Sequence, residues 1–440
     1  MIPTNPSDEA EQRVEGEPVP PAEEDPVVAE AAVKTELPLF PIVGVGASAG
    51  GLEAYRRLLR ALSPNTGMAF VLVQHLAPEH QSMLATILAR ETSMPVLGVR
   101  DEPRVEPNHV YVIPPNRAML MTDGHLRLIP RDENRGQLRS IDVFLRSLAE
   151  EQSHHAIGVI LSGTGSDGTL GLEAIKGEGG ITFAQDGSAQ HDGMPRSAAA
   201  GGFVDYVLPP EGIAAELARI ARHPYVAPEA APEDAESIEA RARVDLNRIL
   251  RLVHHRIGVD FTLYKSTTLF RRITRRMLLH RLDGLADYLA LLRDDAGEVQ
   301  ALYQDILINV TEFFRDAPCF ETLKARVLPK LVADRPRTDP LRIWVLGCST
   351  GEEAYSLAMT ISEYAAERGA EVPAQIFATD LNERGIEKAR AGLYGKGIAR
   401  DVSAERLRRF FIESDGGYQV SKGIREMCVF ARQNAVNDPP

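Results

Sequence analysis

Between Leu39 and His223, six short apolar runs alternate with segments of helical periodicity. The runs are rich in β-branched and aromatic residues, which favour strands, and the segments between them repeat apolar residues at helical spacing. The runs are PIVGVGA, AFVLVQHL, HVYVIP, AIGVILSG, ITFAQD and FVDYVLP. This alternation predicts an α/β fold with a mainly parallel sheet and helices on both faces. In such sheets, binding and catalytic groups gather at the carboxyl ends of the strands.

The chain of 440 residues is too long for one core and predicts several domains. Residues 1–38 hold ten acidic and two basic side chains with frequent proline, a composition typical of disorder. A stretch rich in proline, alanine and glutamate then predicts a linker, and a helical pattern follows it. The expected segments are a disordered acidic tail at 1–38, an α/β domain at 39–223, a linker at 224–240, an all-helical module at 241–333 and a partial α/β domain at 340–440.

Composition excludes several classes of protein. No apolar run reaches the ~20 residues of a membrane helix, and the acidic N-terminus is unlike a signal peptide, so we expect a cytoplasmic protein without membrane insertion. The three cysteines lack metal-ligand spacing, which argues against a disulfide framework and a metal site. Of the net charge of −13, the tail supplies −8, and bulk charge gives no case for nucleic-acid binding.

The segment VGVGASAGG has two possible functions. Gly44, Gly46 and Ala49 fit the G-x-G-x-x-A pattern, in which glycines let a pyrophosphate approach a helix N-terminus. Gly46, Ser48 and Gly50 also fit G-x-S-x-G, in which small residues allow a sharp turn that exposes a nucleophilic serine. Each pattern is weak alone, so other parts of the chain must decide.

The ends of the later strands favour the nucleophile. A dinucleotide site needs an acidic residue ~20 positions on, at the end of the second strand, but that strand ends in Gln74 and His75. A neutral imidazole can take the proton of a serine hydroxyl, and a carboxylate can orient that imidazole. Asp167, in ILSGTGSDGTLG, follows another apolar run. Ser48, His75 and Asp167 are therefore the candidate catalytic residues, in a chain order that disfavours the ordinary α/β-hydrolase fold.

Five motifs in order resemble the catalytic domain of the CheB-type chemotaxis protein-glutamate methylesterases. They are GASAGG, QHLAPEHQSMLA, YVIPPN, LSGTGSDGTLGLEAIK and AQDGSAQHDGMPRSAAAGG. The resemblance implies that a Ser48, His75 and Asp167 triad hydrolyses γ-glutamyl methyl esters on chemoreceptor cytoplasmic helices without a cofactor, with glutamine deamidation as a related reaction. It also implies an oxyanion site at backbone N–H groups near Ala49. Thr164 stands where the family often has methionine.

Two later motifs, NVTEFFRDAPCFETL and LGCSTGEEAYSLAM, resemble the CheR-type chemoreceptor glutamate methyltransferases, and the helical module resembles their N-terminal domain. The segment GCSTGEE follows an apolar run and opens a helix, so Gly347 and Gly351 can let a cofactor approach the backbone. Asp380 ends the next strand, where a carboxylate can hold ribose hydroxyls. The resemblance implies a Rossmann-like S-adenosylmethionine (AdoMet) domain whose contacts are Asn309, Thr311, Arg315, Glu352, Asp380, Asn434 and Ala435, with Glu353 as the alternative to Glu352.

The basic segment FRRITRRMLLHR has two interpretations. Arg271 and Arg275, and also Arg272 and Arg276, share helix faces at i, i+4. These faces are either solvated or a docking surface for an acidic receptor helix. Nucleic acid is not favoured as a partner, because aromatic side chains are not interleaved with the arginines.

The chain ends at NDPP, where the resembled methyltransferases continue. We therefore expect uncovered apolar sheet faces, weak or absent methyl transfer, and a longer fusion that continues into sensor and kinase modules. The first hypothesis is a two-activity chemotaxis protein acting on a receptor or a related methylated protein. The alternatives are a non-catalytic signalling scaffold and an AdoMet-binding sensor.

Overall fold

The computed structural model describes most of the chain. The described residues are 40–74, 83–130, 139–223, 235–307, 311–333, 335–336, 339–369, 371–414 and 417–438. The predicted tail at 1–38 lies outside them, as do His75 and Asn309.

The first domain is built on a seven-stranded parallel sheet in the order β3-β4-β2-β1-β7-β8-β9. Its strands are β1 (Ile42–Ala47), β2 (Ala69–Gln74), β3 (Val96–Gly98), β4 (Val110–Val112), β7 (Ala156–Ile160), β8 (Ile181–Gln185) and β9 (Tyr206–Leu208). Its helices are α1 (Gly51–Ala61), α2 (Leu84–Leu88), α3 (Ser140–Gln152), the 3₁₀ turn η2 (Ser153–His155), α4 (Thr169–Gly177), α5 (Gly193–Ala200) and α6 (Pro210–Ile220).

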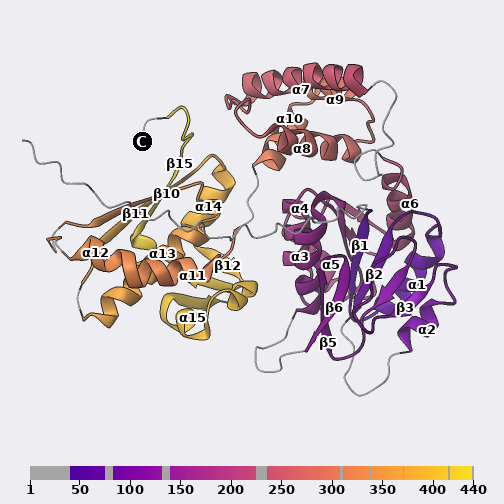
Figure 1. Ribbon diagram of the computed structural model, residues 1–440, viewed down its shortest axis with the longest axis horizontal. Coiled ribbons are helices and arrows are strands. Elements are labelled where there is room, and N and C mark those ends of the chain that lie inside the picture. Colours follow the sequence, from indigo (N-terminus) through magenta and orange to yellow (C-terminus); the bar gives the residue numbers. More distant parts are fainter. Residues whose placement is uncertain are drawn as a thin grey trace, which may run out of the picture. The chain divides into compact units, whose positions relative to one another are not determined.

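Helices cover both faces of this sheet (Figure 1). Side chains of β1 alternate between the two faces, because successive residues of a strand point to opposite sides. Val43 and Val45 pack with α1 and α6 in one core, whereas Ile42 shares the other core with α3, α4 and α5. The predicted α/β architecture is confirmed.

In the first domain, three of the described strands had no counterpart in the sequence analysis. They are the edge strand β3 and an antiparallel hairpin of β5 (Arg117–Thr122) and β6 (His125–Pro130). The hairpin turns at Asp123 and Gly124, both with positive φ. Asp-Gly between two apolar runs is a strong hairpin signal, so the sequence did carry the information.

The two glycines of β1 lie under helix α3. A Cβ added to Gly44 would meet Leu145 Cδ2 at 2.5 Å, and one added to Gly46 would overlap Ile141 Cγ2. The missing side chains thus let α3 approach the strand closely. This packing explains the glycines of the G-x-G pattern without a bound pyrophosphate.

The helical module follows the linker. It consists of α7 (Ala235–Ile257), α8 (Ser266–Leu279), α9 (Leu285–Asp294) and α10 (Ala296–Ile306), packed around a core of their own. Helix α7 begins inside the stretch predicted as linker, because the residues after Pro232 are mostly good helix formers.

The second α/β domain has a parallel sheet in the order β10-β11-β15 and an antiparallel sheet in the order β12-β14-β13. Its strands are β10 (Leu341–Leu346), β11 (Ala374–Asp380), β12 (Leu393–Gly395), β13 (Phe411–Ser414), β14 (Gly417–Val420) and β15 (Cys428–Arg432). Its helices are α11 (Ala317–Thr322), the π turn η3 (Leu323–Val327), α12 (Leu328–Val332), α13 (Glu352–Glu367), α14 (Glu383–Ala391), η4 (Lys396–Arg400), α15 (Ala404–Phe410) and α16 (Lys422–Glu426).

One face of the β10-β11-β15 sheet is covered and the other carries exposed apolar side chains. Val345, Ile376 and Phe430 are buried in the core with α13 and α14. The exposed side chains are Trp344, Leu346, Phe377 and Val429. Parallel sheets are normally covered on both faces, so the expectation of uncovered apolar surface agrees with the described residues.

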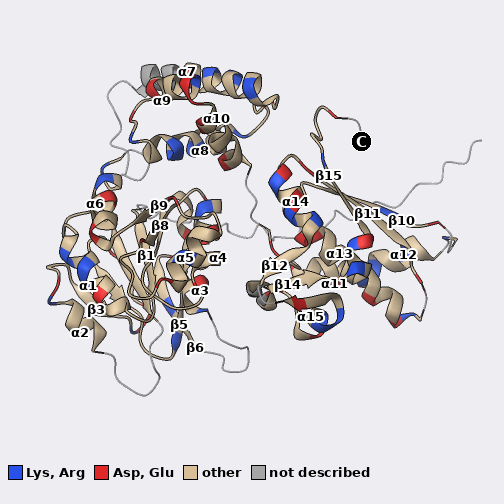
Figure 2. Cartoon of the chain, turned by 180° about the vertical axis from the view of Figure 1, so that it is seen from behind, with Lys and Arg blue, Asp and Glu red and all other residues tan. Residues whose placement is uncertain are grey.

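The arginines of α8, blue in Figure 2, do not form one free basic surface. Arg275 is 1% exposed, and its guanidinium lies 2.5 Å from Asp205 of the first domain and 2.7 Å from Asp305 of α10. Arg272 is also buried and donates to the carbonyls of Lys176 and Gly177, at the end of α4. For these two residues, both interpretations of the basic segment were wrong.

Adding a side chain at Gly46 should destabilise the first domain. We expect Gly46→Ala to lower its free energy of unfolding by about 1 to 3 kcal/mol, because α3 must move away from β1. The measurement is urea unfolding. Gly98→Ala is the matched control in a strand, because a Cβ there meets nothing within 4 Å. Equal midpoints for the two variants would contradict the packing argument.

Removing the Arg275 side chain should be costly. Asp205 would be left buried without its strongest partner, and loss of one member of a buried ion pair costs about 3 to 5 kcal/mol. Arg248→Ala is the control, because the Arg248 side chain is largely exposed and its ion pair with Asp245 is worth little. We expect thermal unfolding to shift strongly downward for Arg275→Ala alone, and similar shifts in the two variants would refute the assignment.

Candidate functional site

Ser48 lies in a tight turn between β1 and α1. Its backbone N–H donates to the Ser162 carbonyl at 2.9 Å, and its own carbonyl accepts from the Gly51 N–H at 2.9 Å. Gly50 has a φ of 74°, a left-handed conformation that favours glycine. The turn therefore needs the small residues of the G-x-S-x-G pattern, and Ser48 stays half-buried at its centre.

The strands on either side of β1 end beside this turn. Strand β1 pairs with β2 on one side and with β7 on the other, all in parallel register. Gln74, the last residue of β2, pairs with Ala47 directly before Ser48. His75 follows Gln74 in the chain but lies outside the described residues. The sheet thus brings the chain positions that precede Ser48 and His75 to the same edge.

Asp167 follows β7 and is 5% exposed. Its Oδ1 accepts from the N–H groups of Asp142 and Gly168, both at 2.9 Å, and its Oδ2 accepts from Ile141 N–H at 3.1 Å. Two of these donors belong to the first turn of α3, where unpaired N–H groups favour a carboxylate. Asp167 is therefore fixed in place by the same helix that packs on the glycines of β1.

The helix after Ser48 presents its N-terminus to the turn. Gly50, the cap residue of α1, supplies no side-chain hydrogen bond to it. Backbone N–H groups at a helix start carry partial positive charge and can stabilise an oxyanion. Thr164 is exposed, whereas its chain neighbour Gly163 is buried, and a Cβ on Gly163 would come within 3.1 Å of Ser48 Cβ.

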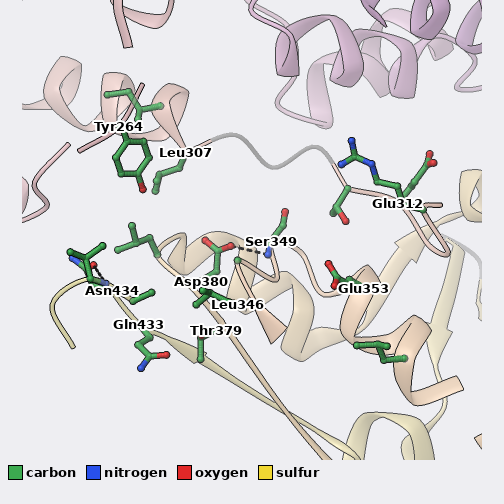
Figure 3. Close-up of a pocket in the computed structure, with 18 of the residues that line it drawn as sticks. Tyr264, Leu307, Glu312, Leu346, Ser349, Glu353, Thr379, Asp380, Gln433 and Asn434 are labelled. Carbon is green, nitrogen blue, oxygen red and sulfur yellow. Dashed lines mark hydrogen bonds between the residues drawn. The ribbon is translucent and has the colours of Figure 1, made fainter. Parts of the chain in front are cut away.

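A cavity of about 830 Å³ lies at the carboxyl ends of β10 and β11. Figure 3 shows side chains from both the helical module and the second α/β domain around it. Five of the predicted cofactor contacts line this cavity: Thr311, Arg315, Asp380, Asn434 and Ala435. Asn309, another predicted contact, lies outside the described residues.

Asp380 is held at the end of β11 by backbone donors. Ser349 N–H donates to its Oδ2 at 2.8 Å, the bond drawn in Figure 3, and Asn382 N–H donates to its Oδ1 at 2.7 Å. Each carboxylate oxygen keeps acceptor capacity beyond one such bond. The side chain can therefore accept hydrogen bonds from ligand hydroxyls while its orientation stays fixed.

The two glycines of the loop after β10 have different roles. Both have positive φ, 70° at Gly347 and 96° at Gly351. A Cβ on Gly347 would meet nothing within 4 Å, and this residue lines the cavity. A Cβ on Gly351 would come within 2.8 Å of Ala389. Gly347 thus leaves its backbone open to a ligand, and Gly351 permits close packing of α13 on α14.

Glu352 and Glu353, the two candidates for one cofactor contact, lie in different surroundings. Glu353 lines the cavity and is labelled there in Figure 3, whereas Glu352 is not among the lining residues. Glu352 is 6% exposed and accepts from Thr350 Oγ1 at 2.6 Å. Burial raises the pKa of Glu352 to about 7. The geometry therefore favours Glu353 for a cofactor contact.

The helical module adds lining residues that the sequence analysis did not single out. Asp260, Tyr264 and Thr268 reach the cavity from the loop before α8 and from its first turn. No local motif marks them, and only the packing of two domains brings them to the site.

Among the described residues, no group of three or more His, Cys, Asp or Glu side chains could hold a metal ion. No helix in the same part of the chain is long and apolar enough to cross a membrane.

Three family models match the chain in succession. They are CheB methylesterase at residues 43–217, the all-alpha domain of CheR methyltransferase at 244–307, and the SAM binding domain of CheR methyltransferase at 309–440. The boundaries of these matches follow the α/β domain, the helical module and the second α/β domain.

Curated relatives match different parts. An uncharacterized 104.1 kDa protein of Rhodobacter capsulatus is 40% identical over 81% of this chain and 39% of its own length. A protein-glutamate methylesterase/protein-glutamine glutaminase of Burkholderia pseudomallei is 37% identical over 44% of this chain and 56% of its own length. A chemotaxis protein methyltransferase of Listeria innocua is 31% identical over 43% of this chain and 70% of its own length.

A solved structure, the CheB methylesterase catalytic domain of Thermotoga maritima, is 30% identical, covers 41% of this chain and 98% of that chain, and has a TM-score of 0.39. The chain spans less than two thirds of the length of the Rhodobacter and Burkholderia relatives.

The cavity fits the cofactor of the SAM binding family. Its volume is within the usual range for small-molecule sites. The backbone at Gly347 is open to a ligand, and the Asp380 carboxylate is held in a fixed orientation at the end of β11. The family models and the Listeria relative agree with this geometry. The chain therefore belongs to the CheR methyltransferase family and carries a CheB methylesterase domain before its methyltransferase part.

Proposed function

We propose that the first domain is a protein-glutamate methylesterase with Ser48 as its nucleophile. The observation that carries this proposal is the turn at Ser48, which lies at the carboxyl end of β1 between the ends of β2 and β7. The name of the Burkholderia relative supports the same reaction and adds glutamine deamidation as a second one.

In the proposed reaction, Ser48 Oγ attacks the carbonyl carbon of a glutamyl methyl ester and passes its proton to His75. The tetrahedral oxyanion is stabilised by N–H groups at the start of α1. The ester C–O bond breaks, methanol leaves with the proton from His75, and water then hydrolyses the acyl-serine. Asp167 would orient the imidazole and stabilise its charged form, as in other serine hydrolases.

We further propose that the second half binds AdoMet in the cavity between β10, β11 and the helical module. AdoMet, when bound, supplies an activated methyl group for transfer to a carboxylate. Asp380 would hold the ribose hydroxyls, Gly347 would let the cofactor approach the backbone, and Asn434 and Ala435 would lie on the adenine side. Thr311, Arg315 and Glu353 would orient the remaining polar groups, because transfer to an already nucleophilic carboxylate depends mainly on positioning.

The proposed substrates are methyl-accepting chemoreceptor helices or a related methylated protein, which places the protein in the cytoplasm. Two opposed reactions on one chain would set the methylation level of that substrate by their balance. Sensor kinase modules are further partners that we propose. A scaffold without turnover is the alternative, and a reactive serine separates the two functions.

Replacing Ser48 should abolish the esterase. We expect Ser48→Ala to release methanol from a methylated chemoreceptor fragment at no more than about one thousandth of the parent rate. The same variant should lose labelling by a fluorophosphonate, which reacts with activated serines. Ser63→Ala, an exposed serine in the same domain, is the control. Parent-like methanol release by Ser48→Ala would exclude the proposed nucleophile.

AdoMet binding should depend on Glu353 and not on Glu352, the two glutamates that follow Gly351. We expect Asp380→Ala and Glu353→Gln each to raise the AdoMet dissociation constant at least about tenfold, because each removes a charged polar partner. Glu352→Gln should leave it within about twofold, because that side chain is buried against Thr350. The measurement is isothermal titration calorimetry. A larger effect of Glu352→Gln than of Glu353→Gln would reverse the assignment.

A further inference from the structure

Ser162 contacts the turn that holds Ser48, between β1 and α1, through both its backbone and its side chain. It follows β7, is 1% exposed, and lies on a different strand end from Ser48. Its carbonyl accepts from the Ser48 N–H at 2.9 Å, and its Oγ donates to the Ala49 carbonyl at 2.8 Å. One residue thus holds the peptide group before Ser48 and the peptide group after Ala49.

The second of these contacts bears on a candidate oxyanion donor. The Ala49 carbonyl and the Gly50 N–H belong to the same planar peptide unit, so fixing the carbonyl fixes the direction of the N–H. Gly50 directly precedes α1, where backbone N–H groups carry partial positive charge. A hydroxyl group that orients this peptide therefore orients a donor available to the developing oxyanion.

Ser162 is itself held by the end of β8 and by the loop that follows it. Its Oγ accepts from His191 N–H at 3.0 Å, and its backbone N–H donates to Gln185 Oε1 at 2.9 Å. The His191 carbonyl, at 3.3 Å, is a longer alternative acceptor for the single hydroxyl proton. The side chain is therefore locked between two segments and cannot rotate freely.

The surrounding glycines fit this arrangement. A Cβ on Gly50 would come within 2.7 Å of Ser162 Oγ, so only glycine permits the close contact. A Cβ on Gly163 would come within 3.1 Å of Ser48 Cβ, so the residue after Ser162 leaves room for the nucleophile.

From these contacts we infer that Ser162 is a positioning residue of the esterase, acting through the Ala49–Gly50 peptide on the oxyanion site. This inference rests on the proposed esterase function. Ser162 would not touch the reacting atoms, and its removal would misalign a donor that acts mainly in the transition state. It should therefore affect kcat more than KM.

The test compares Ser162→Ala with Ser147→Ala in the full chain. Ser147 is the matched control, because it is also buried and bridges two backbone groups, accepting from Met121 N–H at 2.9 Å and donating to the Phe144 carbonyl at 2.8 Å. Unlike Ser162, it lies on α3, and its partners belong to β5 and α3. Methanol release from a methylated chemoreceptor fragment gives kcat and KM, and urea unfolding gives stability.

We expect Ser162→Ala to lower kcat by about tenfold to a hundredfold with KM changed less than about threefold. Ser147→Ala should lose stability but keep the kcat of the parent. Ser162→Thr, which keeps the hydroxyl, should recover most of kcat. A parent-like kcat in Ser162→Ala, or equal losses of kcat in the two alanine variants, would overturn the inference.

Measurements on the parent protein distinguish failure of the positioning role of Ser162 from failure of the proposed esterase function. If the parent neither releases methanol nor reacts with a fluorophosphonate at Ser48, the esterase proposal fails and the inference fails with it. If the parent is active and Ser162→Ala matches it, only the positioning role is refuted.

Discussion

The close approach of α3 to β1 determines the geometry of the first domain. Gly44 and Gly46 remove the side chains that would hold the helix away, so Ile141 and Leu145 rest on the strand backbone. The same approach brings the first turn of α3 to the carboxyl edge of the sheet, where its N–H groups bind Asp167. A packing constraint in the middle of the sheet thus fixes a carboxylate at its edge.

Much of this domain could be predicted from the order of apolar runs. Parallel strands end at one edge, so residues after consecutive runs were expected to meet there, and Ser48 and Asp167 do lie after neighbouring strands. Spacing alone left two interpretations of the glycines open, a phosphate-binding loop and a sharp turn that exposes a nucleophilic serine, because both require small residues. The packing of Gly44 and Gly46 under α3 is a further role that the spacing did not suggest.

The second half shows the limit of motif reasoning more clearly. Residues of the loop after β10 and the end of β11 were predicted because strand, turn and helix follow each other closely in the chain. Tyr264 and Asp260 could not be predicted in this way, because they reach the cavity from the helical module. The burial of Arg272 and Arg275 in α8 was also missed. A pattern of charged residues normally predicts a solvent-exposed helix face, and it gives no sign of an acidic partner such as Asp205.

That partner has a consequence for dissecting the protein. Burial favours the neutral form of Asp205, but the positive charges of Arg275 and Lys176 hold its pKa below the usual range. If the two halves were produced separately, Asp205 would keep only Lys176 as its cationic partner, and Arg275 would keep only the carboxylates of its own half, such as Asp305. Each half would then lack the charge partner that the other half supplies, so measurements on isolated halves would understate the stability of the intact chain.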